Sequence, residues 1–363
     1  MPVVPEAQRY REPAEGSADW VVRTIGSVDG YRDGAAAEAL ISCPADVTRC
    51  PRTGRLFFTD TENRCIRALS ADLRTVATMC TRGVRTVTAI QALPDGRVLY
   101  SDREWREVRA LSADMAVVAT VAGSRPTQGE LSIENACCHR DGAALEARFN
   151  LPVGMCLLAD GRVLICDRAG RRVRMLSADL QTVSTVAGDG TQGHRDGPAL
   201  QARLLDPMDL CMLPDGRVVI SEFEGCLLRM LSADLQTMST GVGNASRTLG
   251  YRDGPAADAQ CNHPTGVAAL ADGTVLFVDC GNACVRQLSA DLTSVSTFAD
   301  GSGDFAFDLP LGICPLPDGR VVVCDSNNHC LRVLERGVPE PPPGSAIVPA
   351  VADEGLLGKR TRE

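Results

Sequence analysis

A short motif that returns six times along the chain constrains its fold more than any other feature. The triplet Ser-Ala-Asp begins at Ser17, Ser70, Ser112, Ser177, Ser232 and Ser289. An acidic residue and an arginine seven positions apart recur as Asp60/Arg67, Asp102/Arg109, Asp167/Arg174, Glu222/Arg229, Asp279/Arg286 and Asp325/Arg332. A pattern that returns at intervals of this size indicates one supersecondary unit that is built again and again.

Each unit contains four short runs of β-forming residues. In the third unit these runs span 153–158, 162–166, 172–176 and 182–187. Asp-Gly separates the first two runs and Ser-Ala-Asp the last two, and both sequences are typical of hairpin turns. Six units of four antiparallel strands predict an all-β protein with the architecture of a six-bladed β-propeller.

The sequence also predicts how the ring closes. The sixth unit ends at 334–337 without a fourth strand, whereas the N-terminal part supplies Ser-Ala-Asp at 17–19 and an apolar run at 20–25. We therefore expect the N-terminal strand to complete blade 6, which removes an open sheet edge. The predicted domains are an N-terminal extension (1–16), the propeller (17–336) and a Pro-rich, disordered tail (337–363).

Three segments resemble a known repeat family. They are Pro-Thr-Gly-Val-Ala at 264–268, Asp-Ser-Asn-Asn-His at 325–329, and Ala-Gly-Asp-Gly followed by Arg-Asp-Gly-Pro-Ala within 187–199. These segments look like NHL repeats, and the resemblance covers roughly 17–336. It implies the propeller fold but no single activity, because NHL propellers serve as protein scaffolds, as RNA-binding modules and in a few cases as enzymes.

Two repeated features are interpreted as architecture. An active site is built once, so the sixfold acid–arginine pair is expected to hold each blade together. Four inter-blade loops carry an Arg-Asp-Gly sequence before an Ala-rich stretch. Their aspartates are predicted to cap one-turn helices, and these residues are Asp33, Asp141, Asp196 and Asp253.

Metal chemistry has weak candidates. The NHL-like peptidyl-hydroxyglycine lyases hold a central metal with several histidines, but the four histidines here share no ligand pattern. Six-bladed propeller lactonases hold calcium with acidic residues at the channel, and two positions after the blade-opening residue this chain has Asp46 and Asp209. Calcium prefers six to eight oxygen ligands, so these two carboxylates are weak metal candidates and no cofactor is predicted. The cluster 137–139 (Cys-Cys-His) is weaker still.

A partner surface is predicted where the repeats differ most. We call the four strands of a unit a, b, c and d in the order of the sequence. Because neighbouring strands run antiparallel, the a–b and c–d turns, which are nearly the same in every unit, lie on one face of the ring. The b–c hairpins and d–a loops, which differ between units, lie on the other face. Blades 2 and 3 carry a tryptophan among arginines in these hairpins, which is typical of interaction hot spots. The predicted contact residues are Trp105, Arg103, Arg106, Arg168, Arg171 and Arg172. Truncation of Trp105 is expected to weaken binding by about 2 kcal/mol and to leave folding nearly unaffected.

Composition narrows the function classes. The net charge of −9 and the 4% aromatic content argue against nucleic acid as the ligand. No apolar run is long enough to span a membrane. Eight of the 16 cysteines fall at equivalent positions of successive units, which predicts free thiols in a reducing compartment. The leading hypothesis is a non-enzymatic, cytoplasmic protein-interaction scaffold, or a structural subunit of a larger assembly. It is expected to bind proteins with acidic or phosphorylated segments through the face of the b–c and d–a loops. The alternatives are a metal-dependent hydrolase or lyase, an RNA-binding domain, and hairpin tips without a partner.

Overall fold

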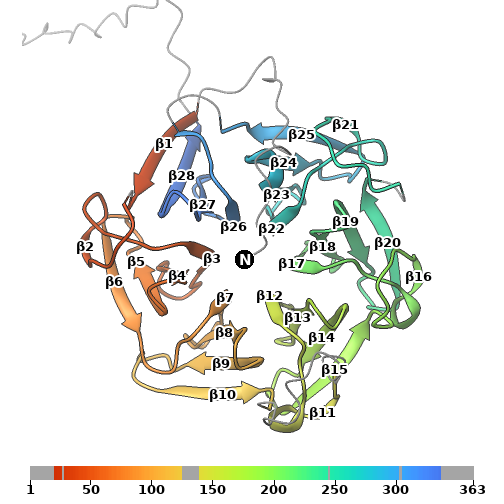
Figure 1. Cartoon of the computed structure of the whole chain (residues 1–363), viewed down its shortest axis with the longest axis horizontal. Helices are drawn as coiled ribbons and strands as arrows, with labels where there is room; N and C mark the ends of the chain where they lie inside the picture. Colours follow the sequence, from red (N-terminus) through yellow and green to blue (C-terminus); the bar gives the residue numbers. More distant parts are fainter. Residues whose placement is uncertain (1–19, 27, 125–138, 244–245, 302–304, 337–363) are drawn as a thin grey trace, which may run out of the picture.

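Six β-sheets stand around a central axis like the blades of a propeller (Figure 1). This computed structural model describes residues 20–26, 28–124, 139–243, 246–301 and 305–336. The sheets contain four or five antiparallel strands each, and the innermost strands surround the axis. The predicted six-bladed propeller is therefore confirmed.

Each blade runs from an inner strand a to an outer strand d in the order of the sequence. Blade 1 consists of β3 (Pro44–Arg49), β4 (Leu56–Asp60), β5 (Cys65–Leu69) and β6 (Thr75–Cys80). Blade 2 consists of β7 (Val87–Ala92), β8 (Val98–Asp102), β9 (Glu107–Leu111) and β10 (Val118–Ala122). Blade 3 consists of β12 (Pro152–Leu157), β13 (Val163–Asp167), β14 (Arg172–Leu176) and β15 (Thr182–Ala187). Blade 4 consists of β17 (Pro207–Met212), β18 (Val218–Glu222), β19 (Leu227–Leu231) and β20 (Thr237–Val242). Blade 5 consists of β22 (Pro264–Ala269), β23 (Val275–Asp279), β24 (Cys284–Leu288) and β25 (Ser294–Ala299). In the third blade, the strands lie within one residue of the expected runs.

The sixth blade is built from both ends of the described chain. It contains β26 (Pro310–Pro315), β27 (Val321–Asp325), β28 (Cys330–Arg336) and, as its outer strand, β1 (Trp20–Ile25). Strand β1 pairs antiparallel with β28, from Trp20 opposite Arg336 to Ile25 opposite Leu331 (Figure 1). The Trp20 indole Nε1 also donates a 2.8 Å hydrogen bond to the Phe298 carbonyl of blade 5. The predicted closure by the N-terminal strand is therefore confirmed.

Four blades carry a short fifth strand that the repeat pattern does not reveal. These edge strands come from the inter-blade loops, pair with strand d, and are β2 (Gly34–Ala35), β11 (Gly142–Ala143), β16 (Gly197–Pro198) and β21 (Gly254–Pro255). In the part of the chain that the structure describes, the complete helical segments are one-turn 3₁₀ helices, namely η3 (Ala144–Glu146), η4 (Ala199–Gln201) and η5 (Cys280–Asn282). Over the described ranges, the structure offers no helix of the length and apolarity that a membrane span needs.

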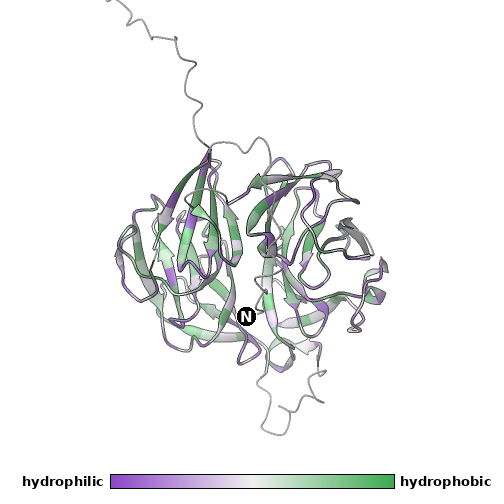
Figure 2. Cartoon of the chain, turned by 45° about the horizontal axis from the view of Figure 1, so that its top comes forward, coloured by the Kyte–Doolittle hydropathy of each residue, from purple (hydrophilic) through white to green (hydrophobic). Residues whose placement is uncertain are grey.

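The hydrophobic core lies between neighbouring blades. Strands b are buried along their whole length because blades pack against both of their faces, whereas the outer strands alternate between buried and exposed residues. Figure 2 shows hydrophobic residues concentrated in the strands and hydrophilic ones in the turns. The 14 cysteines of the described residues are free, and 13 of them are buried, so they act as small hydrophobic side chains.

The repeated acid–arginine pair holds each of four blades to its preceding loop. In blade 3, Arg174 is fully buried and donates to Asp167 at 3.2 Å and to the loop residue Asp141 at 2.7 Å. The same arrangement recurs at Arg67, Arg229 and Arg286. The pair is thus an architectural element, because two carboxylates neutralise the charge of a buried guanidinium.

The predicted capping role of the loop aspartates is wrong. In η3, the residue at the N-cap position is Ala143, and no side chain caps that helix. Asp141 instead accepts hydrogen bonds from Arg174 and from the backbone N–H of Thr185 in strand d. The distant arginine and the edge of the sheet provide stronger donors than a one-turn helix does.

Candidate functional site

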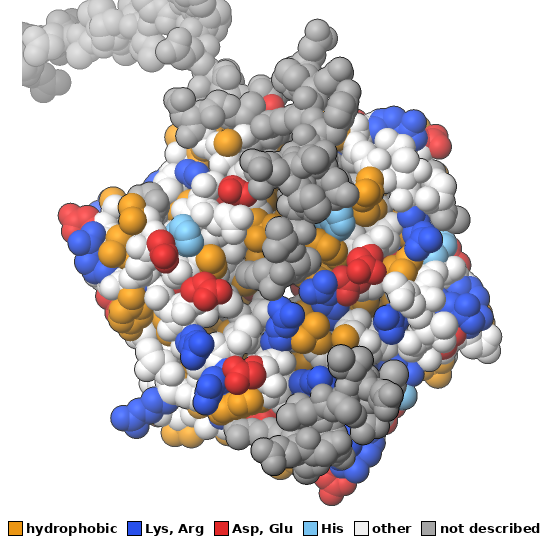
Figure 3. Space-filling model, viewed as in Figure 1, with side chains coloured by type: hydrophobic (Ala, Val, Ile, Leu, Met, Phe, Trp, Pro, Cys, Tyr) orange, Lys and Arg blue, Asp and Glu red, His pale blue; other side chains and the backbone are white. Residues whose placement is uncertain are grey.

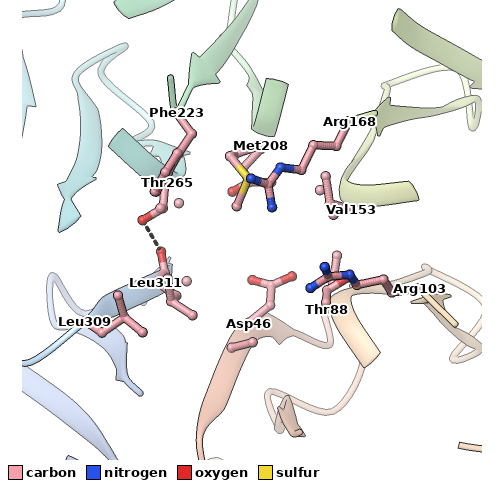
Figure 4. A pocket seen from close by; sticks show the side chains of 16 residues that line it. Asp46, Thr88, Arg103, Val153, Arg168, Met208, Phe223, Thr265, Leu309 and Leu311 are labelled. Atoms are coloured by element: carbon pink, nitrogen blue, oxygen red, sulfur yellow. Dashed lines mark hydrogen bonds between the residues drawn. The ribbon is translucent and has the colours of Figure 1, made fainter. Parts of the chain in front are cut away.

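A pocket of about 60 Å³ lies at the mouth of the central channel, on the face of the b–c hairpins and d–a loops. Residues from all six blades line it, and two arginines from blades 2 and 3 point into it (Figure 4). Figure 3 shows basic and hydrophobic side chains together near the centre of this face. The site therefore combines positive charge with an apolar wall.

The second residue after each blade-opening position forms the floor of this pocket. The six equivalent residues are Asp46, Ala89, Gly154, Asp209, Gly266 and Gly312. At Gly154, an added Cβ would lie 2.5 Å from the Cα of Asp209, and at Gly312 it would lie 2.7 Å from the Cα of Asp46. Glycine is required at these two positions because inner strands of neighbouring blades approach each other closely.

Asp46 and Asp209 fasten inner strands of neighbouring blades to each other. Asp46 Oδ2 accepts a 2.8 Å hydrogen bond from the N–H of Ile90 in blade 2. Asp209 Oδ2 accepts a 3.0 Å hydrogen bond from the N–H of Val267 in blade 5. Burial raises the pKa of Asp209 to about 7, and burial together with the charge of Asp209 raises the pKa of Asp46 well above its usual value. Both carboxyls thus favour the protonated form more than exposed aspartates do.

These two acids do not make a calcium site with the side chains around them. Among the described residues, no group of three or more His, Cys, Asp or Glu side chains is arranged to hold a metal ion. Both oxygens of Asp46 already accept backbone hydrogen bonds, from Val47 and Ile90. The donor set therefore falls short of the six to eight oxygens that Ca²⁺ prefers. The Cys-Cys pair of the 137–139 cluster lies outside the described residues.

Arg103 and Arg168 form the basic part of the channel mouth. Arg168 makes a bidentate ion pair with Asp206, with its Nε 2.6 Å from Oδ1 and its Nη2 2.5 Å from Oδ2. Its guanidinium also lies 5.7 Å from the ring centre of Phe223. The Arg103 guanidinium has no hydrogen-bond or ion-pair partner within the described part of the chain. Burial lowers the pKa of Arg103, and the positive charge of Arg168 lowers it further.

Three other predicted contact residues do not join the pocket. Arg172 donates to the carbonyls of Gly170 and Asp189, at 2.9 and 3.0 Å, and so supports its own hairpin. Arg171 reaches Gln192 at 3.4 Å, and Arg106 occupies a left-handed position in the hairpin with φ of 55°. The structure therefore brings together Arg103 and Arg168, but not the other arginines of the predicted set.

Trp105 is half-buried and folds back onto its own blade. The guanidinium of Arg109 lies 4.8 Å from the indole ring centre, and that of Arg85 lies 5.7 Å from it. The loop before blade 2 lacks an Arg-Asp-Gly sequence, and Arg109 pairs instead with Glu107 at 3.8 Å. The contact with Arg109 favours a loss of stability on truncation of Trp105, in place of the nearly unaffected folding expected from the sequence, and its role in partner binding stays a prediction.

Phe223, Asp206 and the apolar wall of the pocket were not predicted from the sequence. A positional signal exists: Arg103, Arg168 and Phe223 each follow the repeated acid of their blade directly. Asp206 and Leu309 each precede the proline that opens their blade. A comparison of these two positions among the six units would have located the channel mouth.

A second, larger cavity of about 430 Å³ occupies the other end of the channel. Asp46 and Asp209 line both cavities, so they form the waist between them. Methionine and cysteine side chains contribute to its wall, including Met155, Cys156 and Met212. Burial raises the pKa of Cys156 to about 12, so its thiol is not activated as a nucleophile.

The fold and this channel define a six-bladed β-propeller, one repeat of which matches a known family. The NHL repeat family matches residues 307–334, which include strands β26 and β27 and most of β28. A stretch of 91 residues is 28% identical to the protein SUPPRESSOR OF QUENCHING 1, chloroplastic, from Arabidopsis thaliana. The match covers 25% of this chain and 9% of that relative, so it concerns a small part of a longer protein.

Solved structures with the same fold have diverse descriptions. An auxiliary nutrient binding protein from Bacteroides thetaiotaomicron superposes with a TM-score of 0.66 at 12% identity, over 88% of this chain and 77% of that one. A gluconolactonase from Xanthomonas campestris superposes with a TM-score of 0.58 at 13% identity, over 90% of this chain and 99% of that one. The virginiamycin B lyase from Staphylococcus aureus superposes with a TM-score of 0.54 at 11% identity, over 87% of this chain and 99% of that one. At these identities the similarity establishes the fold alone.

Proposed function

We propose that this chain is a non-enzymatic interaction propeller that binds acidic segments of partner proteins at its channel mouth. The observation that carries the proposal is the Arg103 guanidinium, which lies half-buried beside Arg168 without an acceptor among the described residues. A half-buried cation without a partner is costly, and an incoming carboxylate would satisfy it. The many buried free thiols support an intracellular, reducing location for this binding.

The test compares retention of partner proteins by three forms of the full chain. Wild type, Arg103→Glu and Arg97→Glu are immobilised and exposed to the same cell extract. Arg97 is a matched control because it lies in an a–b turn on the opposite face, where it pairs with Asp95. Proteins retained by wild type and by Arg97→Glu should be lost with Arg103→Glu. Equal retention by all three forms would contradict the proposal.

A hydrolase or lyase is the second candidate, and one observation favours it. Asp209 lies in a pocket and has a pKa of about 7, which suits a general base at neutral pH. Its Oδ2 already accepts the Val267 N–H, which favours the architectural role. Metal analysis of purified protein, and lactone hydrolysis by wild type and Asp209→Asn, would separate the two candidates. Bound metal, with activity lost in the variant, would support the enzyme.

RNA binding is the third candidate, supported only by the two arginines at the mouth. The net charge of −9 opposes it, because nucleic-acid affinity depends on attraction to phosphates. A binding assay with single-stranded RNA at two salt concentrations tests it directly.

A further inference from the structure

The charges around the channel mouth leave one positive charge for a ligand. Arg103 and Arg168 contribute two positive charges, and the bidentate partner Asp206 cancels one of them. Below them, burial raises the pKa of Asp46 and so favours its neutral form. The complement of this mouth is therefore a monoanion, because a dianion would place a second negative charge beside Asp206 with no further cation to offset it.

The donor group has the geometry of a carboxylate binder. A guanidinium presents its N–H groups as a planar fork that matches the two oxygens of a carboxylate. Figure 4 shows the guanidinium ends of Arg103 and Arg168 directed into the same pocket. Asp206 occupies the Nε and Nη2 edge of Arg168, whereas the whole fork of Arg103 is open to a ligand, and Nη1 of Arg168 can add a further donor.

The remaining wall of the pocket is apolar and small. Val153, Met208, Phe223, Leu309 and Leu311 surround the basic groups (Figure 4). A volume of about 60 Å³ is far below the 300 to 1,000 Å³ typical of pockets for drug-sized ligands. The space fits one side chain, with a neighbouring apolar side chain on the wall.

Accordingly, we infer that the mouth recognises a single acidic side chain flanked by apolar residues within a partner protein. This inference rests on the proposed function and names its ligand. It places the carboxylate on the fork of Arg103 and the flanking side chains against Phe223 and Leu309.

The experiment uses short peptides and the full-length chain. Blocked peptides with a central Leu-Glu-Leu, Leu-Gln-Leu, Ser-Glu-Ser or Leu-phosphoserine-Leu are titrated into the protein by calorimetry. Leu-Glu-Leu should bind at least tenfold more tightly than the glutamine and serine peptides, and no less tightly than the phosphoserine peptide. Arg103→Gln should lose that tenfold preference. Arg106→Gln, a change of equal charge in the same hairpin that does not line the pocket, should keep it.

Melting temperatures separate loss of binding from loss of folding. If Arg103→Gln unfolds early, Arg103→Lys replaces it, because it keeps the charge and removes the fork; it should keep only part of the preference. Equal binding of the glutamine or serine peptide, tighter binding of the phosphoserine peptide, or no binding of any peptide would overturn the inference. When the peptide test contradicts the inference, the retention test shows how far the failure reaches. If retention of partner proteins does not depend on Arg103, the proposed function is wrong as well. If retention does depend on Arg103, only the assignment of the ligand is wrong.

Discussion

The carboxylate of Asp46 is hydrogen-bonded to the backbone N–H of Ile90 in the next blade, at 2.8 Å. A side chain that lines the channel therefore also joins two blades, and Asp209 does the same with Val267. Their raised pKa values follow from this enclosed position between inner strands. The chemistry of the channel is thus coupled to the stability of the ring.

The first prediction concerns the pH dependence of stability. The folded-state pKa of Asp209, about 7, lies above the unfolded value of 3.8, so the folded state binds the proton more tightly. The contribution of Asp209 to the free energy of unfolding is therefore complete below pH 4. It decreases by about 1 kcal/mol per pH unit as the pH rises to about 7, where it is lost. Denaturant unfolding of wild type and Asp209→Asn from pH 4 to 8 measures the difference. A difference between the two proteins that does not change with pH would contradict this prediction.

The second prediction concerns the buried arginines. Arg174→Met should destabilise the protein by about 3–5 kcal/mol, because it leaves Asp167 buried without its cation. Arg109→Met should cost less, since Arg109 contacts no loop aspartate and is not fully buried. Denaturant unfolding of both variants tests the comparison. Equal losses would mean that the loop aspartates add nothing.

The third prediction concerns closure of the ring. Deletion of residues 1–26 removes β1 and uncovers the edge of β28, so the variant should aggregate or melt at a much lower temperature. Deletion of residues 340–363 should leave the melting temperature nearly unchanged and serves as the control. An N-terminal deletion that stays monomeric at the wild-type melting temperature would refute the role of β1.

The fourth prediction concerns Trp105. Because the indole packs against Arg109 and Arg85, Trp105→Ala should cost about 1–2 kcal/mol of stability. Trp105→Phe keeps an aromatic face and should recover part of this loss. Melting curves, read together with partner retention, separate the two roles. Full stability in the alanine variant would mean that the stacking contributes little.

The fifth prediction concerns the cysteines. Burial raises the pKa of Cys65 and Cys314 to about 12, so these thiols should react slowly in the folded protein. In denaturant without reductant, thiol titration should find nearly all 16 cysteines. Substantially fewer would indicate disulfides and would contradict the expectation of a reducing compartment.

The sequence by itself determined the number of blades, their strands and the closure of the ring. The reason is local: hairpin turns and alternating apolar residues specify a blade, and the missing fourth strand of the sixth unit could come only from 20–25. The sequence also placed Asp46 and Asp209 in the channel, because equivalent positions of a repeat occupy equivalent places in the ring.

Only the tertiary structure decided which side chains meet between units. The pairing of Asp141 with Arg174 and the convergence of Arg103 with Arg168 join residues of different loops and blades. So does the ion pair of Arg168 with Asp206, across 38 residues of the chain. Such contacts depend on the angle between blades and on the direction of each side chain, which sequence spacing does not specify. The site is therefore a property of the assembled ring, whereas the blade is a property of the repeat.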